Sequence, residues 1–92
     1  MAFWMYVLRC SDASYYIGHT DDLEKRIAEH HWGRVSPYTR KRRPVYVVFV
    51  EEFPTREEAL VRERQVKGWS RAKKEALIKG NWNHLRELSR HL

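Results

Sequence analysis

Hydrophobic positions gather in short runs that predict β-strands. Residues 3–8 (FWMYVL) and 45–50 (VYVVFV) are apolar or aromatic at both odd and even positions, as expected of strands that are covered on both faces. The run at 45–50 is filled with β-branched and aromatic residues, so we expect it to be the central strand. A further strand is expected at 15–20 (YYIGHT), which forms a hairpin with the first strand through turn-forming residues at 11–14 (SDAS).

Polar caps and spaced apolar residues predict the first helix. Asp21 can accept hydrogen bonds from the first turn, and Glu24, three residues later, completes a variant of the capping box. Leu23 and Ile27 lie four apart and give this helix a buried row. We expect the helix to end near Gly33, because glycine readily adopts the left-handed conformation found just after helices.

A polar segment separates this helix from the 45–50 strand. Residues 33–44 show neither helical nor strand periodicity, so the sequence predicts a loop there. After the strand, Thr55 and Glu58 form a second capping box that opens another helix.

The C-terminal third is expected to be helical. Ser70 can cap a helix over 71–79 that Gly80 closes, and a last short helix is expected over about 81–90. The predicted order is β-β-α-β-α-α-α, which is not the βαβ alternation of a parallel sheet. We therefore expect an α/β protein of the α+β kind, with a small three-stranded, largely antiparallel sheet flanked by helices.

Size and composition indicate a single domain over residues 1–92. The chain has 92 residues, 42% hydrophobic, which suffices for one modest core and argues against wholesale disorder. The apolar runs at 3–8 and 45–50 have six residues each, far below the roughly 20 needed to cross a bilayer. No basic region precedes the first run, as it would in a secretory signal, and a single cysteine excludes an internal disulfide. We therefore expect a cytoplasmic protein that does not enter a membrane.

The charge favours a polyanionic partner. Lys and Arg number 18 against 12 acidic residues, which gives a net charge of +6, and nucleic acid is a natural partner for such a surface. From charge alone, a basic protein without such a partner is an equally good interpretation. Two basic groups are candidates for phosphate contacts, with a solvated surface as the alternative. They are Arg40, Lys41, Arg42 and Arg43, and Lys67, Arg71, Lys73 and Lys74.

A carboxylate on the apolar side of a predicted helix is the most unusual feature of the chain. At about 100° per residue, Glu63 projects between Ala59 and Val66. Removing a carboxylate from water costs several kcal/mol unless a partner receives it. That partner is either a structural ion-pair residue, with Arg26 and Arg62 as candidates, or a divalent cation such as Mg²⁺, which needs only one or two carboxylates.

Other polar residues are expected to lie near the edge of the core. Arg26 and His30 are four apart on the first helix, beside its apolar row, where they can line a concave surface or remain solvated. Tyr6 and Tyr16 lie on neighbouring predicted strands, where phenols are usually core residues. His19 is the histidine outside this helix that we expect to have a role.

Taken together, these residues resemble the GIY-YIG endonuclease domain, and most closely its small stand-alone bacterial members. The similar segments are 4–7 (WMYV), 16–30 (YIGHTDDLEKRIAEH) and 58–63 (EALVRE), so the resemblance covers nearly the whole chain. The register of the second segment carries the specificity: Tyr16, Ile17, Gly18, Thr20, Leu23, Arg26 and His30.

The chain departs from the family pattern at two places. Trp4 and Met5 stand where the family name has Gly and Ile, and only Tyr6 is kept. We interpret this as a packing variation, since the tyrosine hydroxyl is the chemically active part. Asn81 or Asn83 could match an asparagine that the family usually has near the end of the domain.

The resemblance implies a metal-dependent endonuclease acting on nucleic acid, DNA most of all, with low sequence specificity and a role in DNA repair or recombination. Glu63 matches the carboxylate that holds a single Mg²⁺ or Mn²⁺, and Arg26 would bind the scissile phosphate. Tyr16 would orient or deprotonate the attacking water, assisted by Tyr6 and His30. Because a free tyrosine has a pKa of about 10, a basic role requires positive charge nearby.

We expect further residues to contact substrate. Gly18 is needed where backbone or substrate passes close by. The other expected substrate contacts are His19, Lys25, Arg40, Lys41, Arg42, Arg43, Lys67 and Lys74.

Two other functions remain open at this point, and we take the protein as a monomer by default. One is a nucleic-acid-binding module that keeps the fold without catalysis, although binding alone would not require Glu63. The other is a protein-interaction domain that uses Trp32, Trp69 and Trp82, but these residues are expected to lie in the core or between helices.

Overall fold

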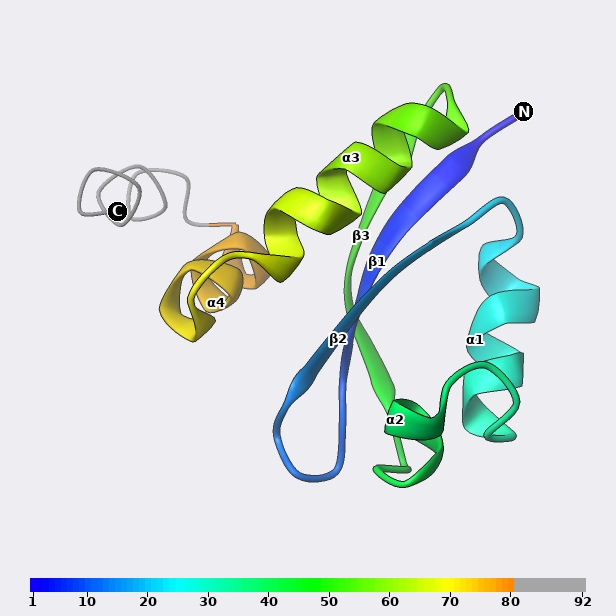
Figure 1. Ribbon diagram of the computed structural model, residues 1–92, viewed down its shortest axis with the longest axis vertical. Helices are drawn as coiled ribbons and strands as arrows, with labels where there is room; N and C mark the ends of the chain where they lie inside the picture. Colours follow the sequence, from blue (N-terminus) through cyan, green and yellow to red (C-terminus); the bar gives the residue numbers. More distant parts are fainter. Residues whose placement is uncertain (81–92) are drawn as a thin grey trace.

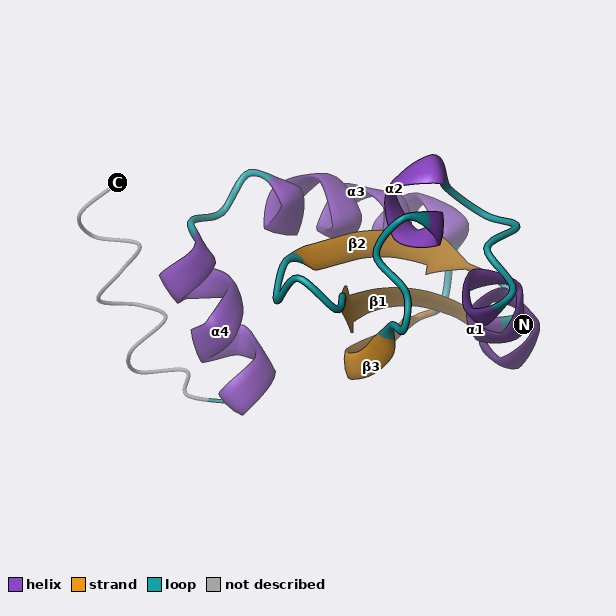
Figure 2. Ribbon diagram, turned by 90° about the horizontal axis from the view of Figure 1, so that it is seen from below, coloured by secondary structure: helices purple, strands orange, loops and turns teal. Residues whose placement is uncertain are grey.

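A three-stranded antiparallel sheet forms the centre of the molecule. The computed structural model describes residues 1–80 (Figure 1), so the predicted helix at 81–90, with Trp82 and both asparagines, lies outside the described residues. Strand β1 (Phe3–Arg9) lies between β2 (Tyr15–Thr20) and β3 (Tyr46–Phe53) and pairs with both (Figure 2). The predicted fold class and element order are confirmed for the described residues.

The prediction that the third strand is central is wrong, because β3 lies at an edge. Residues 5–8 of β1 are all buried, whereas Tyr46, Val47 and Val50 of β3 are exposed. A composition rich in β-branched and aromatic residues indicates a good fit to a pleated surface and does not distinguish an edge strand from a central one.

The sheet separates two apolar clusters because alternate residues of a strand point to opposite faces. On one face, Met5, Val7 and Ile17 pack against α3 (Arg56–Lys67) and α4 (Arg71–Lys79). The hydrophobic residues of these helices that join this cluster are Val66, Leu77 and Ile78.

The opposite face packs against the first helix. Tyr6, Leu8 and Tyr16 lie in a second cluster with Leu23 of α1 (Leu23–His31). In Figure 1, α1 and α2 lie well apart from α3 and α4. Each side chain of the β1–β2 hairpin therefore faces either α1 or α3, depending on its position in the strand.

The helix caps agree in part with the sequence predictions. Thr55 and Ser70 cap α3 and α4 as predicted, and Gly33, with φ of 72°, follows the end of α1. The residue that caps α1, however, is Asp22, which accepts from the backbone N–H of Lys25 at 3.2 Å. The helix begins at Leu23, one residue later than predicted, and the carboxylate of Asp21 pairs with Arg56 at 3.0 Å.

The segment predicted to be a loop contains a short helix, α2 (Pro37–Arg40). Ser36 caps it by accepting from the backbone N–H of Tyr38 at 3.1 Å, and Pro37 occupies the first turn. Proline suits that position because its missing N–H would have no partner within the helix. The turn brings Thr39 into a fully buried position beside α1.

The two tryptophans among the helices differ in burial. Trp32 is 63% exposed, contrary to the expectation of a packed position, because it is the residue that ends α1. Trp69 is partly buried against the cluster under α3. None of the helices described for residues 1–80 combines the length and apolar character needed to span a bilayer.

Candidate active site

The candidate residues lie around the edge of β2 that is not paired with β1. Tyr6 and Gly18 are partners in the β1–β2 register, and Met5 is the partner of His19. Tyr6 therefore points toward α1, and His19 points toward α3. Arg26 and His30 come from α1, and Glu63 comes from α3.

We describe the site as two halves. The α1-side half comprises Tyr6, Tyr16, Arg26, His30 and Thr39. The α3-side half comprises His19, Glu63 and Lys67. The two halves lie on opposite faces of the β1–β2 hairpin.

Gly18 is required by its neighbour in the sheet. A Cβ atom at this position would lie 2.5 Å from the Tyr6 hydroxyl oxygen and 2.6 Å from its Cζ. Tyr6 cannot move aside easily, because its side chain is fully buried and hydrogen-bonded. The close approach expected at this glycine is therefore made by the tyrosine of the neighbouring strand.

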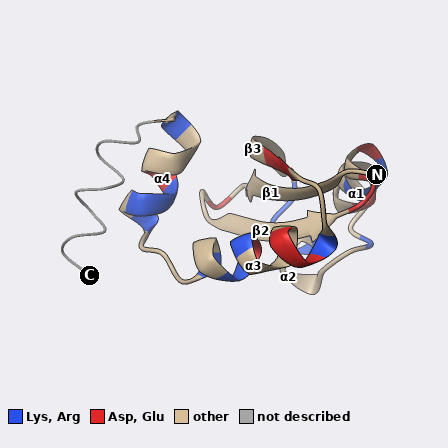
Figure 3. Ribbon diagram, turned by 90° about the horizontal axis from the view of Figure 1, so that it is seen from above, with Lys and Arg blue, Asp and Glu red and all other residues tan. Residues whose placement is uncertain are grey.

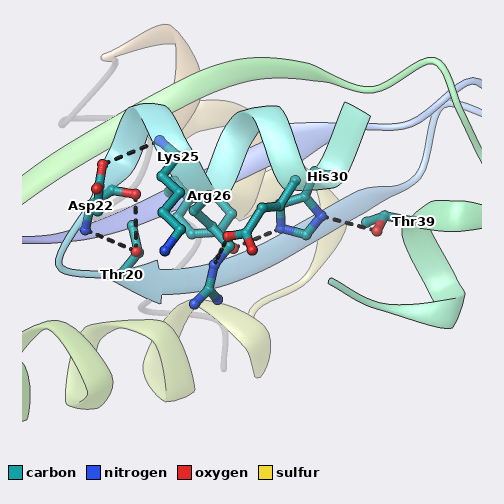
Figure 4. Close-up of polar contacts among 8 residues, drawn as sticks. Thr20, Asp22, Lys25, Arg26, His30 and Thr39 are labelled. Carbon is teal, nitrogen blue, oxygen red and sulfur yellow. Dashed lines mark hydrogen bonds and ion pairs between the residues drawn. The ribbon is translucent and has the colours of Figure 1, made fainter. Parts of the chain in front are cut away.

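Hydrogen bonds link the buried groups of the α1-side half to α2. The Tyr6 hydroxyl lies 2.8 Å from His30 Nε2, and His30 Nδ1 lies 3.0 Å from Thr39 Oγ1. The Thr39 hydroxyl in turn donates to the carbonyl of Ser36 at 3.3 Å. Figure 4 shows His30 and Arg26 projecting from α1, with His30 in contact with Thr39.

The donor and acceptor of each hydrogen bond in this series follow from the bond between Thr39 and Ser36. Because Thr39 donates its only hydroxyl proton to Ser36, it accepts from His30 Nδ1–H. Burial lowers the pKa of His30 to about 4, and the charges of Arg26 and His31 contribute further. The imidazole ring of His30 is therefore neutral at pH 7, and its Nε2 accepts a hydrogen bond from the hydroxyl of Tyr6.

The hydroxyl of Tyr6 is within electrostatic range of the other candidates. Burial raises the pKa of Tyr6 well above its usual value of 10.0, the charge of Tyr16 raises it further, and Arg26 opposes the rise. The carboxylate of Glu63 also contributes a smaller increase. Tyr6 therefore remains protonated at neutral pH, and the structure brings Tyr6, Tyr16, Arg26 and His30 together.

Arg26 lies where a ligand can reach it. Its guanidinium is partly exposed and contacts Glu29 at 3.6 Å, a long i,i+3 ion pair that contributes little to stability. The same two residues border a polar cavity of about 380 Å³ at the Thr20 end of β2. The other residues that line it are Asp21, Asp22 and Lys25.

In the α3-side half, Glu63 pairs with two residues that sequence analysis did not name as its partners. It is only 8% exposed, and its oxygens lie 2.9 Å from His19 Nδ1 and 3.1 Å from Lys67 Nζ. The predicted partners are wrong: Arg26 pairs with Glu29, as described above, and Arg62 pairs with Glu51 at 3.0 Å. Lys67 is one turn along the same helix, a spacing that favours such a pair.

The residues around Glu63 fit a singly anchored cation and not a protein cage. Among residues 1–80, no group of three or more His, Cys, Asp or Glu side chains is placed to hold a metal ion. Each oxygen of Glu63 has one hydrogen-bond partner, whereas a carboxylate oxygen can accept two. Mg²⁺ commonly takes one carboxylate and fills its other positions with water and substrate phosphate.

The basic run 40–43 is more ordered than a flexible phosphate-binding loop. Arg42 pairs with Asp12 at 2.9 Å, and Arg43 donates to the carbonyls of Arg40 and His31. Arg40 and Lys41 are exposed. Phosphate binding by these four residues stays a prediction, although Arg42 and Arg43 already have structural contacts.

The second basic group lies nearer the site. Figure 3 shows Lys and Arg residues along α3 and α4. Lys67 contacts Glu63 as described, and Lys74 lines a cavity together with Tyr16. Lys73, by contrast, is buried and lies over the ring of Trp69, so it belongs to the packing of α4.

Sequence reasoning missed two residues that the structure brings to the site. Thr39 fixes the orientation of His30, and Tyr38 stacks near Tyr16, with ring centroids 6.3 Å apart. The Ser-Pro pair at 36–37 is a signal for a helix start that could have revealed α2. Nothing in the local sequence indicates which side chains of that helix face the site.

A family model described as "GIY-YIG catalytic domain" matches residues 2–76 of the chain. The chain is also similar to proteins designated UPF0213. It is 48% identical over 74 residues to one from Halobacterium salinarum, which covers 80% of this chain and 96% of the relative. It is 47% identical over 75 residues to one from Staphylococcus saprophyticus, which covers 82% and 92% respectively.

Two solution NMR structures are similar to the fold. The UPF0213 protein BH0048 from Bacillus halodurans has a TM-score of 0.57 and 40% identity, covering 97% of this chain and 98% of that chain. The protein EF2693 from E. faecalis has a TM-score of 0.61 and 41% identity, covering 87% and 85%.

Proposed function

The chain belongs to the GIY-YIG catalytic domain family, and from this premise we propose that it is a divalent-metal-dependent endonuclease. Its substrate would be nucleic acid, with DNA favoured, and its sequence specificity would be low. The observation that carries the proposal is the cluster of Tyr6, Tyr16, Arg26 and His30 beside β2, with the buried carboxylate of Glu63 paired to His19 of the same strand. Pure binding would not require a buried carboxylate.

Arg26 is the residue that would bind the scissile phosphate. It is partly exposed, and its only described ion-pair partner in residues 1–80 is the nearby Glu29. A phosphate can displace that weak contact because a guanidinium binds phosphate through two parallel hydrogen bonds. The charge that develops on the phosphoryl oxygens would then be stabilised by a group already in place.

The two tyrosines would have different roles. Tyr6 is fully buried and has a raised pKa, so it would act as a fixed hydrogen-bond donor to His30. Tyr16 is only partly buried and makes an edge-to-face contact with the ring of His30. It can reach solvent, and it would therefore orient or deprotonate the attacking water.

Glu63 would hold Mg²⁺ or Mn²⁺, with water and substrate phosphate as the remaining ligands. When bound, such a cation screens the phosphate charge and assists departure of the leaving oxygen. The chain would contribute the carboxylate and the neighbouring His19, which holds it in place through a hydrogen bond of 2.9 Å. Lys67 would be free to turn toward substrate once a cation occupies its place.

Substitution of the carboxylate tests the proposal. Purified protein would be incubated with labelled branched, nicked and single-stranded DNA and with RNA, in Mg²⁺, Mn²⁺ or chelator. We expect Glu63→Gln to lower the cleavage rate by roughly 100-fold or more. Glu52→Gln, at an exposed carboxylate on β3, is the matched control and should cleave normally.

Two outcomes would contradict the proposal. Equal cleavage by the wild type and Glu63→Gln would show that the activity comes from another source. Salt-dependent binding without turnover in any metal would favour the non-catalytic binding module. One observation speaks for that alternative, because His19 and Lys67 already compensate Glu63 without a cation.

The cellular setting forms part of the same proposal. We place the activity in the cytoplasm, in DNA repair or recombination, with the monomer as the acting unit. The free and buried Cys10 supports a reducing compartment.

A further inference from the structure

A second cavity lies at the other end of the β2 edge. It has a volume of about 310 Å³ and begins at Tyr16, on the side away from the Arg26 cavity. Its lining residues are Tyr15, Tyr16, Ile17, Tyr38, Lys67 and Lys74. We call it the aromatic cleft. The polar cavity, the candidate site at Gly18 and the aromatic cleft thus follow one another along a single strand edge.

We propose that the aromatic cleft binds the unpaired base of a nucleotide that neighbours the scissile phosphate. The substrate would then be nucleic acid that is single-stranded on this side of the cut. The inference rests on the proposed function, and it adds the substrate class and the residues that recognise it.

The lining matches the chemistry of a nucleobase. Three tyrosines and Ile17 give a mostly apolar surface, and a base is a flat ring that stacks on aromatic side chains whatever its identity. Stacking would therefore supply binding without sequence preference. A paired base keeps both faces against its neighbours in the duplex, so only an unpaired base can enter.

Tyr38 is held in position before any ligand arrives. The guanidinium of Arg42 lies 3.7 Å from the centroid of the Tyr38 ring, and Arg42 also donates to the Tyr38 carbonyl at 3.1 Å. Asp12 in the hairpin turn anchors that same arginine. Arg42 does not line the cleft, and it holds Tyr38 beside Tyr16, so that the two stacked rings form one aromatic wall of the cleft.

The charges around the two cavities differ in a way that suits this ligand. Among residues 1–80, Lys67 and Lys74 are the charged residues that line the aromatic cleft, and no carboxylate of these residues lines it. The polar cavity near Arg26 is lined by Asp21, Asp22 and Glu29 as well as by basic residues. A phosphate next to a stacked base would thus meet lysines, and the aromatic cleft is the cavity better suited to a nucleotide.

Binding to short oligonucleotides in chelator tests the inference without cleavage. Labelled single-stranded pentamers would carry one abasic site at each position in turn. We expect one abasic position to weaken binding at least fivefold and the others to have little effect. Tyr38→Leu should weaken binding of the intact pentamer to a similar extent, and the sensitive abasic position should then have no further effect.

Matched variants separate stacking from folding. Tyr46→Leu removes an exposed tyrosine from β3, the opposite edge of the sheet, and should bind like the wild type. Tyr38→Trp keeps an aromatic ring and should retain the sensitive position even if Tyr38→Leu proves unstable. Abasic effects that are uniform along the pentamer, or that add to the Tyr38→Leu effect, would overturn the inference.

This experiment is independent of the proposed function. A protein that shows the sensitive position but cleaves nothing in any metal would retain the aromatic cleft and lose the nuclease proposal. A protein that cleaves through Glu63 but shows no sensitive position would retain the nuclease proposal and lose the base-binding role of the aromatic cleft. Tighter binding of a fully paired duplex than of the matching single strand would also contradict the inference.

Discussion

The two halves of the candidate site hold their polar groups in opposite ways. In the α1-side half, Tyr6, His30 and Thr39 are fully buried, neutral and joined by hydrogen bonds. In the α3-side half, the carboxylate of Glu63 is compensated by Lys67, whose side chain is 53% exposed. One half is thus a fixed arrangement of neutral groups, and the other is an ion pair at the border of solvent.

This difference separates stability from ligand exchange. A buried donor or acceptor that loses its partner costs the full desolvation penalty, so the α1-side half should resist change. An ion pair near solvent contributes little and is screened by salt, so the α3-side half can exchange partners when a phosphate or cation arrives. Substitutions in the two halves should therefore give different results.

The largest expected effect is a dependence of stability on pH through His30. Its pKa falls from 6.5 to about 4 on folding, because burial disfavours the charged ring. Between these two pH values the unfolded chain binds more protons than the folded protein. The contribution of neutral His30 to the free energy of unfolding is therefore complete above pH 6.5 and is lost as the pH falls toward 4. The free energy of unfolding should fall with a slope approaching about 1.4 kcal/mol per pH unit.

Urea titrations at a series of pH values would measure that slope. His30→Gln should remove this component, whereas His31→Gln, at the exposed neighbouring position, removes only the smallest cause of the lowered pKa and should leave most of the slope in place. Equal slopes for the wild type and His30→Gln would mean that the α1-side half is not a neutral buried arrangement.

Gly18→Ala should also disturb the α1-side half strongly. The added methyl group would lie 2.5 Å from the buried hydroxyl oxygen of Tyr6, and overpacking of this kind costs about 1–3 kcal/mol. Gly68→Ala is the control, since its nearest contact would be 3.6 Å away, and it should change stability by less than about 1 kcal/mol. If the two variants unfold at the same urea concentration, the close approach of Tyr6 is not the reason that position 18 requires glycine.

Thr39→Val should have a moderate effect, because it leaves the Nδ1–H of His30 buried without an acceptor. The cost should be about 1–3 kcal/mol, and Thr39→Ser, which keeps the hydroxyl, should restore most of it. ¹⁵N NMR of the imidazole should show one tautomer, protonated at Nδ1, in the wild type and Thr39→Ser. A tautomer protonated at Nε2 in the wild type would reverse the direction of the hydrogen-bond chain.

Lys67→Gln should have the smallest effect on stability. It removes an i,i+4 ion pair with Glu63 that is worth about 0.3–0.5 kcal/mol. Nucleic-acid binding should nevertheless weaken and become less dependent on salt, because one phosphate contact is lost. A loss of stability comparable to that of Thr39→Val would remove the distinction between the two halves.

The sequence was informative about elements and less so about their arrangement. The hairpin, the Thr55 and Ser70 caps and the α+β order follow from local patterns, and all are present. The position of β3 at an edge depends on which surfaces are covered, which strand composition does not report. The helix α2 is short, and its Ser-Pro start lies within a segment that is otherwise polar.

The same limit applies to the site. A motif in register identified Tyr16, Arg26 and His30, and helical periodicity placed Glu63 on the buried face of α3. Of the two partners of Glu63, His19 depends on how β2 packs against α3, which local spacing does not encode. Lys67 is four residues along the same helix, and that spacing could have indicated it. The role of Thr39 depends on a tertiary contact in the same way.

The bond between His19 and Glu63 joins residues that are 44 positions apart. During synthesis, all three strands and α1 leave the ribosome before α3 does, so the growing polypeptide carries the tyrosines and Arg26 before it carries the carboxylate. Competence for the proposed reaction would then begin only when α3 docks. If the proposed function holds, a division of the chain between Phe53 and Arg56 would place the tyrosines and Arg26 in one fragment and Glu63 in the other.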